Sequence, residues 1–343
     1  MGRLPTRLLI DLPNWLGDLV HALPALRAMV RANREGETTL LLPEAHLPLG
    51  RGFGVGVVAR PPGAGWTWAR RTIGASFEVA LTARHSTRAK LLLAATSAVR
   101  RLASAGRGAG WLGLETFPVC RRHHQRHDLD GALALLGLPP VADEAGDLPL
   151  SAACRRAGKQ ALSELTGGQG GVVLCPGARH LPAKRYPAER FAAVGRALRR
   201  AGWAVLVLGG PGEEPLLESV AARCEGTAVP TCWGLDLIAG LLHASNVAVG
   251  NDSGLTHLAA AVGCPTVVLH GPTDPARTGA AGRVRTLIGA GPAGLAAMCP
   301  QRVAWAAQMA VGGEDLHVSQ REAMISRGGG PLAQLAEQGT LNP

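Results

Sequence analysis

The stretch VAVGNDSGLTHL at residues 247–258 decides the fold, because its pattern changes from that of a strand to that of a helix. Val247 to Val249 is short and apolar, as in a buried parallel strand. After the turn residues 251–254, apolar side chains recur at helical spacing from Leu255 to Val262, and Gly263 marks the end of the helix. The helix therefore begins at the carboxyl end of a strand, where its backbone N–H groups favour a phosphate.

Asp252 and Ser253 lie in the turn between that strand and that helix. Their side chains could hold a ribose or sugar hydroxyl, and helix capping alone would also explain them. The string as a whole favours a ligand site.

Working outward, the chain alternates between strands and helices in both halves, which predicts an α/β protein with open parallel sheets. The second half has strands at 172–175 and 203–208, and helices at 188–201 and 235–244. The first half has strands at 7–12, 38–42 and 77–82, and a helix at 89–102, with residues 50–75 unassigned. Ligands of such folds bind at the carboxyl ends of the strands, so we expect a cleft between the two halves.

The length of 343 residues fits two domains. We place the first at 1–150, ending in a Pro-, Gly- and acid-bearing linker, and the second at 151–290. Residues 291–343 are poorly patterned, and we expect them to be an atypical tail, frameshifted or disordered.

Asp18 follows the loop Pro13-Asn14-Trp15-Leu16-Gly17 at the expected start of a helix. The helix dipole favours a carboxylate in the first turn and keeps it ionised. Capping would explain Asp18 equally well on this local pattern.

The formal net charge is +10, and arginine dominates residues 84–126, where Glu115 is the only acid. Anionic lipid head groups, an acidic glycolipid or nucleic acid could be the partner, and a GC-rich genome would also explain the bias. We disfavour nucleic acid, because no nucleic-acid motif is present and aromatic residues are few.

The seven cysteines are scattered without a C-x-x-C pair, which argues against a disulfide framework and a zinc site and fits a reducing cytoplasm. No apolar run reaches the ~18–20 residues of a membrane span. We expect no cofactor and a monomer.

Three separated motifs together resemble glycosyltransferase family 9, the ADP-heptose:lipopolysaccharide heptosyltransferases, and most closely the heptosyltransferase II branch. They are PNWLGD at 13–18, PGA at 176–178 with PAKRYP at 182–187, and GNDSGLTHL at 250–258. The resemblance covers about residues 7–290. It implies a GT-B fold, in which two Rossmann-like domains face a central cleft.

The resemblance also implies site residues. Asp18 is the candidate general base, and Lys184, with backbone near Gly177, would neutralise the donor diphosphate. The loop from Asp252 through Ser253 and Gly254 to Leu255, with His257 nearby, would bind the nucleotide and donor sugar. Glu213 or Glu214 would contact the ribose.

The implied reaction moves heptose from ADP-heptose to the lipopolysaccharide inner core with inversion and without metal. A lysine plus a helix N-terminus can stabilise the leaving diphosphate, and a single displacement needs one base. The enzyme would be cytoplasmic and bound peripherally to the anionic inner membrane, with Arg121 and Arg122 at the acceptor or membrane.

Two alternatives remain, namely a catalytically inactive sugar-nucleotide-binding protein and a GT-B transferase that uses another nucleotide sugar. A Rossmann dehydrogenase is disfavoured, because no G-x-G-x-x-G follows the first strand of either half.

Overall fold

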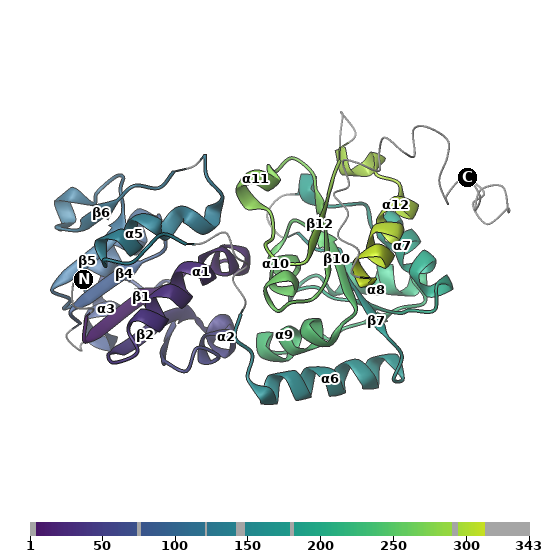
Figure 1. Ribbon diagram of the computed structural model, residues 1–343, viewed down its shortest axis with the longest axis horizontal. Coiled ribbons are helices and arrows are strands. Elements are labelled where there is room, and N and C mark those ends of the chain that lie inside the picture. The colour runs from purple at the N-terminus through teal and green to yellow at the C-terminus, as the bar shows by residue number, and fades with distance from the viewer. Residues whose placement is uncertain are drawn as a thin grey trace.

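The protein folds into two halves, each built around a parallel sheet (Figure 1). This computed structural model describes residues 5–73, 77–120, 122–141, 148–178, 182–289 and 294–312. The strands of the first sheet are β1 (Arg7–Asp11), β2 (Glu37–Pro43), β3 (Gly56–Arg60), β4 (Val79–Thr82), β5 (Arg100–Ser104) and β6 (Glu115–Phe117). Those of the second are β7 (Gly171–Cys175), β8 (Ala204–Val207), β9 (Thr227–Ala228), β10 (Val247–Asn251), β11 (Thr266–His270) and β12 (Val284–Ile288).

Helices connect the strands in both halves. The first half contains α1 (Leu16–Ala32), η1 (Glu44–His46), α2 (Leu47–Arg51), α3 (Trp66–Thr72), α4 (Thr87–Ala94), η2 (Gly110–Leu112), η3 (Gln125–Leu129) and α5 (Asp130–Leu135), where η marks a 3₁₀ turn. The second contains α6 (Ala152–Thr166), η4 (Pro182–Lys184), α7 (Ala188–Arg200), α8 (Glu214–Cys224), α9 (Leu235–Ala244), α10 (Gly254–Ala261), α11 (Pro275–Thr278), η5 (Gly294–Ala297) and α12 (Pro300–Val311). None of the helices in the described ranges combines the length and apolarity needed to cross a membrane.

The two sheets share one strand order, β3-β2-β1-β4-β5-β6 and β12-β11-β10-β7-β8-β9. Numbered within its own half, each is the 3-2-1-4-5-6 order of doubly wound dinucleotide-binding folds. The order reverses between β1 and β4 in the first sheet, and between β7 and β10 in the second. The loops after these four strands therefore border the crevice where such sheets bind ligands.

Alternating side chains bury both faces of the first sheet, as the period of a strand requires. Leu8 and Ile10 belong to the buried cluster that contains the apolar side of α1. Leu9 belongs to the cluster on the opposite face, which includes Ala69 of α3 and Leu92 of α4. Both faces are covered, which explains why the strands are apolar throughout rather than alternating.

The halves are joined where α1 packs against α10 (Figure 1). One buried cluster runs from Leu23 in α1 to Leu258 in α10. α6 opens the second half by packing along α9, where Gly158 lies against the backbone of Gly240 too closely for a Cβ atom. We therefore propose that the domain boundary lies between α5 and α6, near residue 150.

Part of the sequence prediction for the first half was wrong. The expected helix at 89–102 ends at Ala94, and the chain then forms β5, which pairs in parallel with β4. The unassigned span, residues 50–75, contains the end of α2, all of β3 and all of α3. Gly and Arg dominate it and obscured a strand that pairs with β2.

The prediction that residues 291–343 form an atypical tail was also wrong for the part that the structure describes. Residues 300–311 form α12, whose Val303, Ala306 and Ala307 are buried in the core of the second half. α12 packs against α7 and β11, so the second half extends at least to residue 312. The buried side chains of α12 are mostly alanines, and alanine is too small and too common outside cores to mark a buried helix face in the sequence. Residues 313–343 lie outside the described residues.

Candidate active site in the cleft

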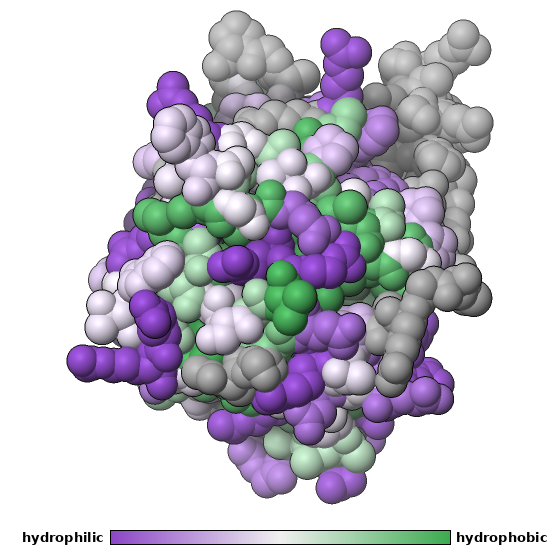
Figure 2. Space-filling model, turned by 90° about the vertical axis from the view of Figure 1, so that its left-hand side faces the viewer, coloured by the Kyte–Doolittle hydropathy of each residue, from purple (hydrophilic) through white to green (hydrophobic). Residues whose placement is uncertain are grey.

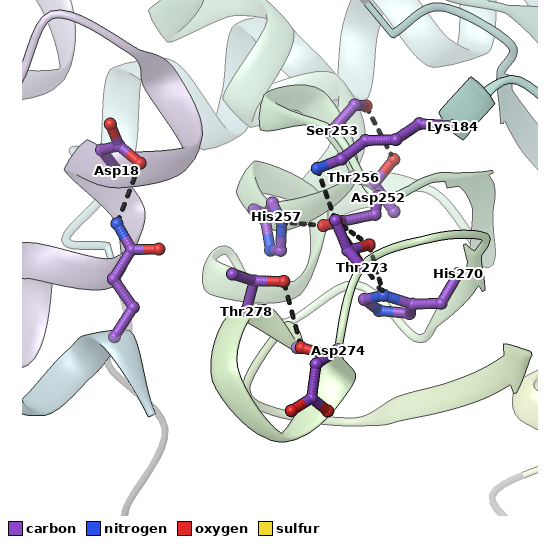
Figure 3. A network of polar contacts seen from close by, with 12 residues as sticks. Asp18, Lys184, Asp252, Ser253, Thr256, His257, His270, Thr273, Asp274 and Thr278 are labelled. Atoms are coloured by element: carbon purple, nitrogen blue, oxygen red, sulfur yellow. Dashed lines mark hydrogen bonds and ion pairs between the residues drawn. The ribbon is translucent and has the colours of Figure 1, made fainter. Parts of the chain in front are cut away.

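A cavity of about 770 Å³ lies between the halves at the carboxyl ends of both sheets. Its lining includes Asp18 from the first half and, from the second, Gly177, Lys184, Glu213, Asp252, Ser253, Gly254, Leu255 and His257. Residues that the sequence places more than 200 positions apart therefore share one cavity. Figure 3 shows Asp18 on one side and the side chains around Asp252 on the other.

Asp252 is the centre of a polar network just after β10 (Figure 3). Its Oδ2 accepts hydrogen bonds from Lys184 Nζ at 2.8 Å and from Thr273 Oγ1 at 2.7 Å. Its Oδ1 lies 2.8 Å from His257 Nε2. Burial opposes the charge of Asp252, but the bonds from His257 and Lys184 outweigh burial and hold the pKa of Asp252 far below its usual range. An ionised Asp252 thus fixes the Lys184 ammonium at the cavity.

The helix behind this network presents its N-terminus to the cavity. Ser253 is the N-cap residue of α10, yet its side chain makes no capping bond; its Oγ lies 3.2 Å from Thr256 Oγ1. The first N–H groups of a helix have no intrahelical partner, and the dipole favours an anion there. Capping therefore does not account for Ser253.

Asn251 holds the three loops of this half together. Its Nδ2 donates to the Pro176 carbonyl at 2.8 Å, and its Oδ1 accepts from the Tyr186 N–H at 2.9 Å. Asn251 is fully buried. Asn251 thus links the β7 loop, the segment after Lys184 and the start of α10 through buried hydrogen bonds.

The structure separates the two glutamates that the sequence left as alternatives. Glu213 lines the cavity and accepts from the Gly210 N–H at 2.9 Å, and a Cβ on Gly177 would collide with its carboxylate. Glu214 instead accepts from Thr231 Oγ1 at 2.6 Å and is not part of the lining. Glu213 is therefore the better placed of the two for a ribose.

Asp18 lies in the first turn of α1, and Gln125 Nε2 donates to its Oδ1 at 2.9 Å. The N-termini of α1 and α10 approach each other at two glycines. A Cβ on Gly254 would lie 2.9 Å from Leu16 Cβ, whereas a Cβ on Gly17 would meet His257 at an ordinary 3.5 Å. Gly254 thus lets the start of α1, with Asp18, approach the start of α10.

A second cavity of about 240 Å³ adjoins the first at the strand-order reversal of the first sheet. Asn14, Trp15, Asp18, His21 and Gln125 line both cavities. The smaller one is completed by Pro13, Ala22, Ala83, Arg84, His85, Ser86, Asp128 and Leu129. Asp18 therefore faces both the larger cavity between the halves and the smaller cavity of the first half.

A buried ionic cluster supports the loop that leads to Asp18. Asp11, fully buried, binds Arg60 through Oδ1 and Arg84 Nε through Oδ2, the latter at 2.8 Å. Arg60 Nη2 also donates to the Leu12 carbonyl at 3.0 Å and to Asn14 Oδ1 at 2.5 Å. The Pro13–Asp18 loop is thereby tied to β1 and β3.

Several residues of this site were missed by sequence reasoning. His21 and Gln125 line the cavity, His124 contacts the His21 ring, and Thr273 donates to Asp252. Arg60 supports the loop before Asp18, and Arg277 bonds to Asp128 across the cleft. Burial, followed by the neighbouring His257 and His124, lowers the pKa of His21 to about 2, so this ring is neutral. The run His123–Asp128 was a local signal that a polar segment returns to the cleft.

The sequence contains one Asp-x-Asp string, Asp128-Leu129-Asp130, and both carboxylates have protein partners. Arg277 Nη2 donates to Asp128 Oδ2 at 2.8 Å across the cleft. Asp130 accepts from the Val141 N–H at 3.0 Å and lies 2.9 Å from His127 Nδ1. Within the described ranges, no group of three or more His, Cys, Asp or Glu residues is arranged to hold a metal ion.

The basic segment 84–126 does not form a single exposed patch. Arg84 binds Asp11, Arg100 pairs with Glu115 at 2.7 Å, and Lys90 is buried. Hydrophilic side chains are spread around this end of the molecule rather than gathered on one side (Figure 2). Arg122 is exposed, and Arg121 lies outside the described residues. Arg122 does not line either of the cavities described above.

Comparisons with known proteins agree with this geometry. The family model of glycosyltransferase family 9 (heptosyltransferase) matches residues 66–297. Lipooligosaccharide heptosyltransferase 2 of Haemophilus influenzae is 36% identical over 117 residues, which cover 31% of this chain and 33% of that protein. Lipopolysaccharide heptosyltransferase 2 of Escherichia coli is 34% identical over 110 residues, 30% of this chain and 32% of that protein. The aligned sequence thus spans about a third of these relatives.

Solved structures match over nearly the whole chain. The ADP-heptose lipopolysaccharide heptosyltransferase II of E. coli superposes with a TM-score of 0.78 at 21% identity, covering 90% of this chain and 100% of that one. A family 9 glycosyltransferase from Veillonella parvula gives 0.82 at 18% identity, with 92% and 99% covered. These likenesses establish the GT-B arrangement of two Rossmann-like domains that the motifs predicted. With the family model matching more than half of its length, the chain belongs to glycosyltransferase family 9.

Proposed function

We propose that this protein is an inverting glycosyltransferase that moves heptose from ADP-heptose to the inner core of lipopolysaccharide. The observation that carries the proposal is one cavity with Asp18 on one wall and Lys184, Asp252 and the start of α10 on the other. Family membership and the names of the matched relatives support the choice of heptose and of a lipopolysaccharide acceptor.

The donor occupies the second half in this proposal. Lys184 and the N-terminus of α10 neutralise the diphosphate, and they can do so without a metal ion because both are positive and held in place. Asp252 and His257 orient Lys184 and contact the sugar. Glu213 accepts hydrogen bonds from the ribose hydroxyls near Gly177.

The acceptor occupies the smaller cavity of the first half, next to Asp18. Asp18 accepts the proton of the acceptor hydroxyl as that oxygen bonds to the anomeric carbon. The bond from this carbon to the ADP oxygen breaks at the same time, and ADP leaves on the opposite side, so the configuration inverts. Gln125 holds the carboxylate in place.

The setting of the reaction is also part of the proposal. We infer a cytoplasmic monomer that needs no cofactor, does not bind nucleic acid, and works at the anionic surface of the inner membrane. The excess of arginine supports the last point, because basic residues near such a surface are attracted to it.

A donor screen by mass spectrometry tests the function. ADP-heptose, ADP-glucose and UDP-sugars are each incubated with de-acylated core acceptors, and the anomeric configuration of any product is read by NMR. We expect a heptose adduct from ADP-heptose alone, with inverted configuration. A product from another donor would replace the substrate assignment, and binding without turnover would identify an inactive sugar-nucleotide-binding protein.

A further inference from the structure

An exposed tryptophan stands on the surface of the first half. Trp111, in η2 between β5 and β6, is 98% exposed, which is unusual for so large an apolar side chain. Four more large apolar residues of this half are exposed, namely Val99 at 79%, Trp15 at 52%, Trp66 at 46% and Leu91 at 44%. Trp15 lines the cleft and Val99 precedes β5, so only Trp66 and Leu91 are grouped with Trp111. Such residues, when gathered, mark a surface that binds something.

These residues belong to neighbouring segments. α3, α4 and η2 cover the same face of the first sheet, since Ala69, Leu92 and Ala109 lie in one buried cluster. The loops that flank them are in contact distance: a Cβ on Gly108 would lie 3.7 Å from Thr87 Cγ2, and one on Gly63 would lie 3.6 Å from Arg88 Nη2. Trp66, Arg88, Leu91, Arg107 and Trp111 are therefore grouped here as the Trp111 surface.

The charge around the Trp111 surface has one sign. Arg88 and Arg107 are exposed within it, and Arg70 and Arg71 are exposed on α3. In the sequence from 45 to 114 the only acid is Glu78. Glu78 lies at the amino end of β4, where it accepts a hydrogen bond from the Thr6 N–H. The loops that follow β3 and β5 lie at the carboxyl ends of the strands, which is the other end of the sheet.

The Trp111 surface adjoins the smaller cavity. Ser86 lines that cavity and is also the N-cap of α4, accepting from the Ala89 N–H at 3.3 Å. Arg88 and Leu91 follow on the outward side of the same helix, whereas Lys90 and Leu92 are buried. A partner that covers the Trp111 surface would thus lie beside the smaller cavity, which Asp18 lines.

We propose that the Trp111 surface docks on a bilayer containing anionic lipids. Tryptophan prefers the interface between head groups and acyl chains, and arginine is attracted to anionic head groups, so the two together fit a membrane better than a protein partner. The docking geometry would bring a lipid-anchored acceptor to the smaller cavity. The choice of an anionic bilayer and the placing of the acceptor rest on the proposed function, whereas the grouping of the Trp111 surface rests on its own residues.

Vesicle flotation with the full chain tests the surface. The vesicles contain phosphatidylethanolamine with 30 mol% phosphatidylglycerol in one arm (about this fraction of anionic lipid gives a strong surface potential) and phosphatidylcholine alone in the other. We expect Trp111→Ser to weaken partition onto the anionic vesicles roughly tenfold. Arg88→Glu/Arg107→Glu should weaken it by at least roughly 25-fold, about fivefold for each arginine lost, and high salt should act in the same direction.

Control variants in the second half test whether losing any exposed apolar residue, or any two positive charges, weakens vesicle binding. Ile288→Ser removes an exposed apolar residue from the second half, and Arg156→Glu/Arg200→Glu makes the same charge change on α6 and α7. Both should bind vesicles as wild type does. Bromolipid quenching adds a direct readout: Trp111→Phe should keep binding but lose much of the quenching of tryptophan emission.

The flotation results show whether the Trp111 surface or another part of the chain binds the vesicles. Unchanged flotation of Trp111→Ser and of Arg88→Glu/Arg107→Glu would overturn the proposal, as would equal loss in the two control variants. Loss in Arg122→Glu alone would move the docking surface to the 121–122 segment. Turnover of a de-acylated acceptor should be the same in Trp111→Ser and wild type. Vesicle binding without any turnover would leave the Trp111 surface standing and remove the proposed function.

Discussion

At the scale of single residues, the proposed function assigns the donor diphosphate to the Lys184–Asp252 pair. The ammonium is held at 2.8 Å by a carboxylate that is itself buried and ionised. A lysine held in this way loses little rotamer entropy when a ligand arrives, which favours tight and oriented phosphate binding.

Lys184→Ala should weaken the binding of ADP and ADP-heptose more than that of AMP, because the β-phosphate loses its cation. Calorimetry with the three ligands measures the difference, which we expect to be roughly tenfold or more for ADP. Lys159→Ala, an exposed lysine on α6, is the matched control and should bind all three as wild type does. Equal losses for AMP and ADP would place Lys184 away from the β-phosphate.

His21 predicts a pH dependence of stability. Its folded pKa of about 2 lies below the value near 6.5 in the unfolded chain, so only the unfolded chain takes up a proton as the pH falls. The free energy of unfolding should therefore decrease by up to about 1.4 kcal/mol per pH unit below pH 6.5. Asp252, whose folded pKa is depressed, loses its contribution only below about pH 4, so the two windows are distinct.

Urea unfolding of wild type and His21→Asn at pH 7.5, 6.0 and 5.0 measures this slope. The variant should show a shallower decrease between pH 6.5 and 5. The remaining slope comes from His46, His124 and His270, because burial lowers the pKa of each of them as well. Identical slopes in the two proteins would show that His21 accepts a proton in the folded state.

At the scale of elements, the approach of α1 to α10 sets the distance between base and donor. Gly254→Ala places a Cβ 2.9 Å from Leu16 Cβ and should push the two helices apart, whereas Gly17→Ala adds a Cβ with an ordinary contact. A displacement of about 1 Å in an active site can cost roughly 100-fold in rate. We expect kcat/KM to fall at least roughly tenfold in Gly254→Ala and much less in Gly17→Ala. A larger effect of Gly17→Ala would contradict this account of the interface.

The same scale shows what the sequence could predict. Residues 247–263 carry strand, turn, helix and end signals within one short window, so β10, α10 and their site were predictable from local pattern. β5, which replaces the end of the expected helix, depends on pairing with β4, and β3 depends on pairing with β2; neither pairing has a local signature. The Lys184–Asp252 and Gln125–Asp18 bonds join residues far apart in sequence, so pairing within the site needed the structure.

At the scale of the whole molecule, the two halves are held together across the cleft by polar contacts. Arg277 Nη1 donates to the His123 carbonyl at 2.8 Å, and its Nη2 donates to Asp128. His124 Nε2 lies 2.8 Å from the Gly279 carbonyl. These contacts favour the closed arrangement in which Asp18 faces the donor side.

Arg277→Ala should open the cleft, since bonds of this charged kind contribute about 1.5–3 kcal/mol. Small-angle scattering should give a larger radius of gyration for the variant, and the KM for the acceptor should rise. Arg283→Ala, an exposed arginine before β12, is the matched control and should leave both quantities unchanged. An unchanged radius and KM in Arg277→Ala would mean that the α1–α10 packing alone holds the halves together.

The central claim is that this cleft transfers a sugar with Asp18 as the base. The most direct measurement is the turnover of ADP-heptose with a de-acylated core acceptor by wild type, Asp18→Asn and Asp236→Asn. Asp236 lies in the first turn of α9, so its variant loses a similar helix-start carboxylate outside the cavity lining. Asp18→Asn should bind ADP normally and lose kcat by ~10²–10⁴, the usual contribution of a general base, while Asp236→Asn turns over as wild type does. Wild-type turnover by Asp18→Asn would contradict the account.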